Sequence, residues 1–147
     1  MAKNEAIDRY HPVAGTALLA LTAANWLTST REAADGFYDR DTSLWGMLSV
    51  VNEHIHSMAV LAVGTIAFCA FICMAFPLHR SHKAVLVSGV LIAVLSAAIM
   101  LNTDSGFSPG PGAWLTLFFS VVTTVTAAAA LTVPVNPDGT PLTPLTD

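Results

Sequence analysis

The stretch MAVLAVGTIAFCAFICMAF, residues 58–76, decides the fold class of this chain. It contains no ionisable side chain except two thiols, and a helix needs roughly 20 such residues to cross the hydrocarbon core of a bilayer. Pro77 ends the stretch, because proline cannot continue a helix, and the polar sequence LHRSHK (residues 78–83) follows. Basic side chains prefer the headgroup region. We therefore predict a transmembrane helix that ends at a membrane surface.

Similar apolar runs occur elsewhere in the chain, and they predict four transmembrane helices in all. Their predicted bounds are residues 12–28, 50–76, 84–101 and 113–133. The runs are continuous, whereas strands of a membrane β-barrel alternate apolar and polar residues. Residues 134–147 are rich in proline and carry no apolar period, which is typical of a disordered tail. The predicted fold is therefore all-α: a polytopic integral membrane protein with a four-helix bundle in residues 1–133, short loops and a disordered C-terminal tail.

The composition of the whole chain agrees with a membrane protein. Of its 147 residues, 54% are hydrophobic and 11% are charged, and the mean hydropathy is +0.62. An ordinary soluble domain carries about 25% charged residues. The net charge of −4 and the two cysteines exclude basic nucleic-acid binders and disulfide-rich secreted scaffolds. We expect the partners to be the lipid bilayer and other membrane protein subunits, and no nucleic acid.

The basic residues predict how the helices are oriented. Four of the six lysines and arginines flank one side of the membrane, at Lys3, Arg9, Arg80 and Lys83. The first connection, residues 29–49, carries the other two and four acidic residues. Positive charge favours the cytoplasmic side, so we expect both termini in the cytoplasm and the chain in the plasma membrane. A cleaved signal peptide is the alternative for the first apolar run, but Glu5 and Asp8 dilute the basic character that such a peptide needs.

A polar group at the predicted outer surface is the candidate metal site. Glu53 and His56 are three residues apart on one helix face, and His54 lies between them. Asp104 in the third connection could supply another oxygen ligand. Zinc or copper suits these ligand types. The competing interpretation is that the residues are solvated side chains of a helix that enters the membrane.

Further histidines lie near the predicted cytoplasmic surface. His11 and either His79 or His82 share that side, so a haem or a quinone between them is conceivable. The interpretation that we favour places these side chains among the lipid headgroups, and haem is the less favoured cofactor. Cys69 and Cys73 lie one turn apart within the second span, where we expect them to pack and not to react.

Small and hydroxyl residues within the spans predict helix contacts. Two rows at four-residue spacing are expected to allow close packing of helix backbones: Gly89, Ala93 and Ala97 in the third span, and Thr16, Ala20 and Ala24 in the first. A hydroxyl stripe runs along the fourth span at Thr116, Ser120 and Thr123. The stripe either lines a polar path or bonds back to carbonyls of its own helix, and we favour the second interpretation.

The spans carry no ionisable residue near mid-membrane, which argues against a self-contained pump or ion-coupled transporter. We expect a small non-catalytic accessory subunit of a larger membrane complex, of respiratory electron-transfer or transport type, without enzyme activity of its own. Two alternatives remain. One is a protein that binds a metal ion or redox cofactor at the outer surface through the Glu53, His54 and His56 group. The other is a small channel that is active as an oligomer, with the hydroxyl stripe along its pore.

Overall fold

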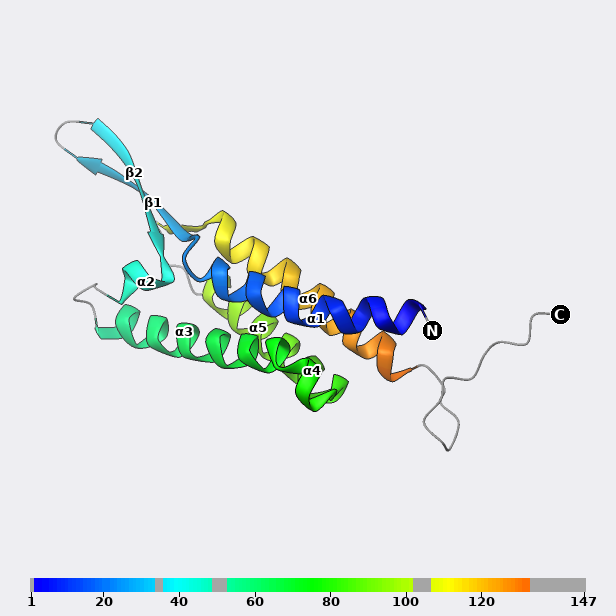
Figure 1. Ribbon diagram of the computed structural model, residues 1–147. Helices are drawn as coiled ribbons and strands as arrows, with labels where there is room; N and C mark the ends of the chain where they lie inside the picture. Colours follow the sequence, from blue (N-terminus) through cyan, green and yellow to red (C-terminus); the bar gives the residue numbers. More distant parts are fainter. Residues whose placement is uncertain (1, 34–35, 49–52, 102–106, 133–147) are drawn as a thin grey trace.

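The computed structural model describes residues 2–33, 36–48, 53–101 and 107–132, and this part of the chain is mostly helical (Figure 1). Its elements in chain order are α1 (Ala2–Leu21), β1 (Asn25–Ala33), β2 (Gly36–Ser43), α2 (Leu44–Met47), α3 (Glu53–Met74), α4 (Phe76–His79), α5 (His82–Leu101), β3 (Phe107–Pro109) and α6 (Pro111–Leu131). The four long helices α1, α3, α5 and α6 lie side by side, and the strands gather at the end opposite the N-terminus (Figure 1).

The long helices form a four-membered antiparallel bundle. Helix α1 packs on α3 and α6, and α5 also packs on α3 and α6, so that α1 and α5 lie across the bundle for most of their length. A bundle of four helices was predicted. Its first helix differs from the prediction: α1 ends at Leu21, and strand β1 begins at Asn25, within the range predicted to be helical.

A three-stranded antiparallel sheet joins the first and third connections, and the sequence did not predict it. Strand β1 lies in the middle, paired with β2 on one side and with β3 on the other. Leu27 faces Pro109 across the β1–β3 pair, and the Gly110 amide donates to the Trp26 carbonyl at 2.7 Å. The sheet therefore ties the end of α1 to the start of α6.

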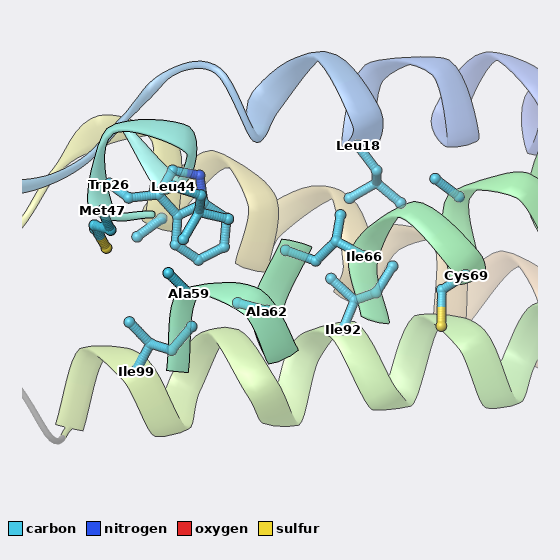
Figure 2. Packing of buried hydrophobic residues seen from close by; sticks show 12 residues of the cluster. Leu18, Trp26, Leu44, Met47, Ala59, Ala62, Ile66, Cys69, Ile92 and Ile99 are labelled. Carbon is cyan, nitrogen blue, oxygen red and sulfur yellow. The ribbon is translucent and has the colours of Figure 1, made fainter. Parts of the chain in front are cut away.

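Trp26 holds this end of the molecule together. Trp26 is the second residue of β1, and its side chain is fully buried among Leu44, Met47 and Ala59 (Figure 2). Its indole N–H donates to the carbonyl of Leu21 at 2.8 Å. The sheet, α2 and the start of α3 therefore share one core with the helices.

The distribution of side-chain sizes is inverted relative to a water-soluble bundle. On α6 the buried positions hold small or hydroxyl residues: Gly112, Ala113, Thr116, Ser120, Thr123 and Ala127. Its exposed positions hold large apolar residues: Trp114, Leu115, Phe118, Val121, Val125 and Leu131. Helix α5 follows the pattern in part: Ser88, Gly89 and Ser96 are buried and Val87, Leu91 and Val94 are exposed, but Val85, Ile92 and Ile99 are buried as well.

The hydroxyl stripe of α6 bonds to its own helix, as predicted. Thr116 donates to the carbonyl of Gly112 at 2.8 Å, Ser120 to that of Leu117 at 2.8 Å, and Thr123 to that of Phe119 at 2.7 Å. All three side chains are fully buried. Their polar hydrogens are therefore satisfied within α6.

The small-residue rows are confirmed at Gly89 in α5, whereas Ala93 and Ala97 are only half-buried, and they are wrong at Thr16 and Ala20 in α1. Gly89 is buried at the α5–α6 contact, where an added Cβ would lie 2.5 Å from Thr124 Oγ1. In α1, however, Thr16 and Ala20 are exposed, and the close approach is made by Gly15, where a Cβ would lie 2.6 Å from the carbonyl oxygen of Ala70 in α3. The prediction for α1 selected the neighbouring helix face.

Among the described residues, two helices are both long and apolar enough to cross a membrane, α5 and α6. Residues 59–74 of α3 form a shorter apolar helix. The prediction of four spans is therefore supported for two helices by length and composition. The predicted tail at residues 134–147 lies outside the described residues.

Candidate functional site

The end of the bundle nearest the N-terminus brings two histidines together. His11 lies on α1, and His82 is the first residue of α5. His11 Nε2 and His82 Nδ1 are 3.4 Å apart, a hydrogen-bond distance. The sequence predicted that His11 would share a surface with His79 or His82, and the structure selects His82.

The sharp turn between α3 and α5 places His82 beside α1. Pro77 lies in the first turn of the short helix α4, and Arg80 then adopts a left-handed backbone conformation with φ of 47°. The Arg80 amide donates to the carbonyl of Phe76 at 2.7 Å, which closes the end of α4. Ser81 accepts a hydrogen bond from the Ala84 amide and starts α5. The chain reverses within a few residues, and His82 therefore faces the first helix.

Phe76 forms the apolar wall of the pair. Its ring lies edge-on to His11, with ring centroids 4.8 Å apart, and at 4.9 Å from the ring of His82. Phe76 is itself buried in a small cluster with Cys73, Val85 and Ala127. This contact removes water from one side of both imidazoles.

Asp8 lies on the other side of His82. Its Oδ1 is 3.6 Å from His82 Nε2, an ion-pair distance slightly longer than a hydrogen bond. A carboxylate at this nitrogen favours a proton on Nε2 of His82, which leaves Nδ1 free to accept a hydrogen bond from His11 Nε2. The three side chains then form a chain from half-exposed Asp8 to fully buried His11.

Three polar atoms of this segment of α1 are buried without a hydrogen-bond partner among the described residues. They are Asp8 Oδ1, Tyr10 Oη and His11 Nδ1. Buried polar atoms of native proteins are nearly always bonded, so these three atoms retain the capacity to bind water or a further polar group. Burial away from water, followed by the neighbouring His82, lowers the pKa of His11 to about 4, and Asp8 opposes this shift. The fold therefore favours the neutral form of His11.

His79 serves a different purpose. Its Nε2 bonds to the carbonyl of Ile72 at 2.9 Å, and its Nδ1 accepts from the Ser81 amide at 2.9 Å. One ring nitrogen is thus bonded to the backbone of α3 and the other to the backbone of the turn. His79 supports the turn, while His11 keeps one nitrogen unbonded within the described part of the chain.

The predicted metal site is not brought into this cluster. The backbone of Glu53, His54 and His56 forms the first turn of α3 at the other end of the bundle (Figure 1). Their side chains, and Asp104 entirely, lie outside the described residues, so the site stays a prediction. Within the described ranges, no group of three or more His, Cys, Asp or Glu side chains is arranged to hold a metal ion.

A haem between His11 and either histidine of the turn was the less favoured prediction. The rings of His11 and His82 are in direct contact, with centroids 5.5 Å apart, and the haem and quinone sites stay predictions. Cys69 and Cys73 are free and buried, in agreement with the predicted packing role.

Sequence reasoning missed Asp8 and Phe76 as members of this site. A signal for Asp8 was present, because Asp8 and His11 have the same three-residue spacing as Glu53 and His56. No comparable signal marks Phe76, which reaches the site through the turn at Arg80. No protein-family model matches the sequence, and no curated protein matches it at a significant level.

Proposed function

We propose that this chain is an integral membrane protein that crosses the plasma membrane four times and acts as a non-catalytic accessory subunit of a larger membrane complex. The observation that carries the membrane assignment is the apolar outer surface of α5 and α6. Contiguous apolar surface of this kind is rare on soluble monomers. Lipid tails are as apolar as these side chains, so contact with lipid carries no free-energy penalty for this surface. Small buried residues allow the close packing that membrane helices require.

For α1 and α3, the support for a membrane span comes from their packing and their exposed apolar side chains. Both helices pack along the two apolar helices in one antiparallel bundle, and Val13, Leu61, Phe68 and Phe71 are exposed large apolar residues on their surfaces. A bundle that inserts two of its helices would leave these side chains in water. Insertion of all four helices, with α1 entering the membrane after His11 as in the predicted span of residues 12–28, buries them in lipid.

The interior of the bundle supports an accessory role. The hydroxyls of α6 bond to carbonyls of their own helix, and α6 contains no ionisable residue. Beyond Lys83, α5 contains none either. Such an interior offers neither a charged path nor a proton donor at mid-membrane. We therefore expect this protein to act by binding other membrane proteins.

Membrane topology is tested with single cysteines at two exposed positions at opposite ends of the bundle, Ser108 in β3 and Leu78 in α4. We expect a membrane-impermeant maleimide added to intact cells to label Ser108→Cys and to leave Leu78→Cys unlabelled until the membrane is opened. The buried native thiols Cys69 and Cys73 provide the background control. Equal labelling of both variants in intact cells would contradict the proposed topology.

The accessory role is tested by isolating the protein from its native membrane in a mild detergent. We expect larger membrane proteins to accompany it in a constant ratio through size-exclusion chromatography. Recovery as a monodisperse free protein would overturn the proposal of a subunit and leave the membrane assignment intact.

A further inference from the structure

We propose that His11 and His82 form a pH-responsive latch, which holds α1 against the turn between α4 and α5 while His11 is neutral and releases it when His11 takes up a proton. The latch does not rest on the accessory role proposed above. It rests on the geometry at the end of the bundle and applies to the chain alone or within a complex.

The closed state buries His11 in surroundings that favour its neutral form. The side chain is fully buried, its Nε2 is 3.4 Å from His82 Nδ1, and the Phe76 ring lies against it. A proton can bind only at the remaining nitrogen, Nδ1, which is buried and unbonded within the described part of the chain. A charge placed there would have neither water nor an acceptor to stabilise it.

Release of α1 removes this penalty. Once α1 separates from Phe76 and His82, Nδ1 faces water and binds a proton from solvent without breaking any covalent bond. The resulting imidazolium is hydrated, and return to the closed site would require that the proton leave. Protonation therefore stabilises the open state, as linkage between proton binding and conformation requires.

Charged and titratable groups around His11 come from each element that packs on it. Helix α1 contributes Asp8 and Tyr10, α5 contributes His82, and α4 and α3 contribute His79 and Cys73, which both contact Phe76. Arg80 and Lys83 are exposed residues next to His79 and His82 in the chain. Asp8 is the acidic group that would stabilise a protonated His11, but it lies against the far nitrogen of His82. His82 stands between the two, and its own protonation would repel a charge on His11.

The latch is tested by amide hydrogen exchange of the full-length protein in lipid nanodiscs, measured by mass spectrometry between pH 7 and pH 4.5 and corrected for the chemical exchange rate. We expect the opening ratio of residues 7–18 to increase by up to about tenfold per pH unit below about pH 6.5, because one proton is linked to opening. A segment of α6, residues 117–127, contains no titratable group and serves as the internal control.

Two variants separate the latch from general acid sensitivity. His11→Gln keeps a polar side chain but cannot titrate, and we expect it to remove the pH dependence of exchange in residues 7–18. His54→Gln changes a histidine whose backbone lies in the first turn of α3, at the other end of the bundle, and we expect it to retain the dependence. An opening ratio that is independent of pH in the unmodified protein, or a dependence that survives in His11→Gln, would overturn the proposal.

A second measurement applies even if His11→Gln does not fold. Nitrogen-15 spectra of the histidine side chains in the unmodified protein report which ring nitrogen carries the proton. At pH 5 we expect His11 to be neutral in molecules whose α1 amides are protected, with the proton on Nε2. A doubly protonated His11 ring in the protected state would overturn the latch.

Discussion

Gly89 of α5 and Thr124 of α6 lie in contact, so that a Cβ added to Gly89 would lie 2.5 Å from Thr124 Oγ1 and 3.1 Å from the carbonyl oxygen of Ser120. The hydroxyl of Thr124 is fixed by its own bond to that carbonyl at 2.8 Å. Neither partner can move away without disturbing α6. The spacing of α5 and α6 therefore depends on the absence of a side chain at position 89.

The first prediction follows from this contact. Gly89→Val should lower the free energy of unfolding by on the order of 1–3 kcal/mol, since overpacking forces helices apart. The measurement is denaturant-induced unfolding in mixed micelles. Gly64 of α3 is the matched control, because a Cβ there would have no neighbour within 4 Å. If Gly64→Val were as destabilising as Gly89→Val, helix propensity and not the contact would explain the effect.

The hydroxyl stripe yields a second prediction. Thr116→Val keeps the side-chain volume and removes a hydrogen bond that lies within α6, so we expect a loss of less than about 1.5 kcal/mol. Thr116→Leu adds volume at a fully buried position and should cost more, about 1–3 kcal/mol. The same unfolding assay compares the two. A Val variant that is the less stable of the pair would indicate a polar role for this hydroxyl.

Global stability should depend on pH through His11. Its pKa is about 4 in the folded chain, against 6.5 for an unperturbed histidine, so the folded chain binds fewer protons than the unfolded chain between these values. Stability is therefore complete above about pH 6.5 and falls as the pH decreases toward 4, by up to about 3 kcal/mol in total. The midpoint of thermal unfolding at several pH values measures this loss. In His11→Gln the loss over this range should be smaller, and an equal loss would assign it to other groups.

A fourth prediction compares two tryptophans at the sheet end of the bundle. Trp26 is fully buried, whereas Trp45 is 51% exposed and donates its indole N–H to Thr22 Oγ1 at 2.9 Å. Trp26→Ala should destabilise the protein by about 3–5 kcal/mol, as is typical of large cavities. Trp45→Ala should cost less, on the order of 1 kcal/mol, for the lost hydrogen bond and partial burial. Thermal unfolding followed by circular dichroism checks the order of the two effects.

Much of the helical framework could be predicted, because long apolar runs such as residues 84–101 have few alternatives to a helix. The bounds of α1 could not, since Ala23, Ala24, Trp26 and Leu27 extend the apolar run although the chain turns after Leu21. The sheet was missed for a related reason. The acidic residues of the first connection suggested a solvated loop, and β3 has three residues, too few for an alternating pattern.

The histidine pair could be predicted only as a shared location. Sequence spacing places His11, His79 and His82 at one surface, but it does not determine how α1 is rotated about its axis. That rotation follows from the close approach of Gly15 to α3, which turns Thr16 and Ala20 outward and His11 inward. The choice of His82 over His79 follows from the left-handed backbone at Arg80, which few non-glycine residues adopt.

The β1–β3 pairing has a consequence for the order in which the chain is assembled. The hydroxyl of Ser108 donates to the Thr28 carbonyl, a bond between residues 80 positions apart in the chain. Contacts between distant segments form late, because the intervening chain must be ordered first. While the chain is synthesised from its N-terminus, the β1–β2 hairpin is complete before α3 emerges, but β3 follows α5. Closure of the sheet thus requires that three long helices have been synthesised first, and it joins the two helical hairpins at the end where their connections meet.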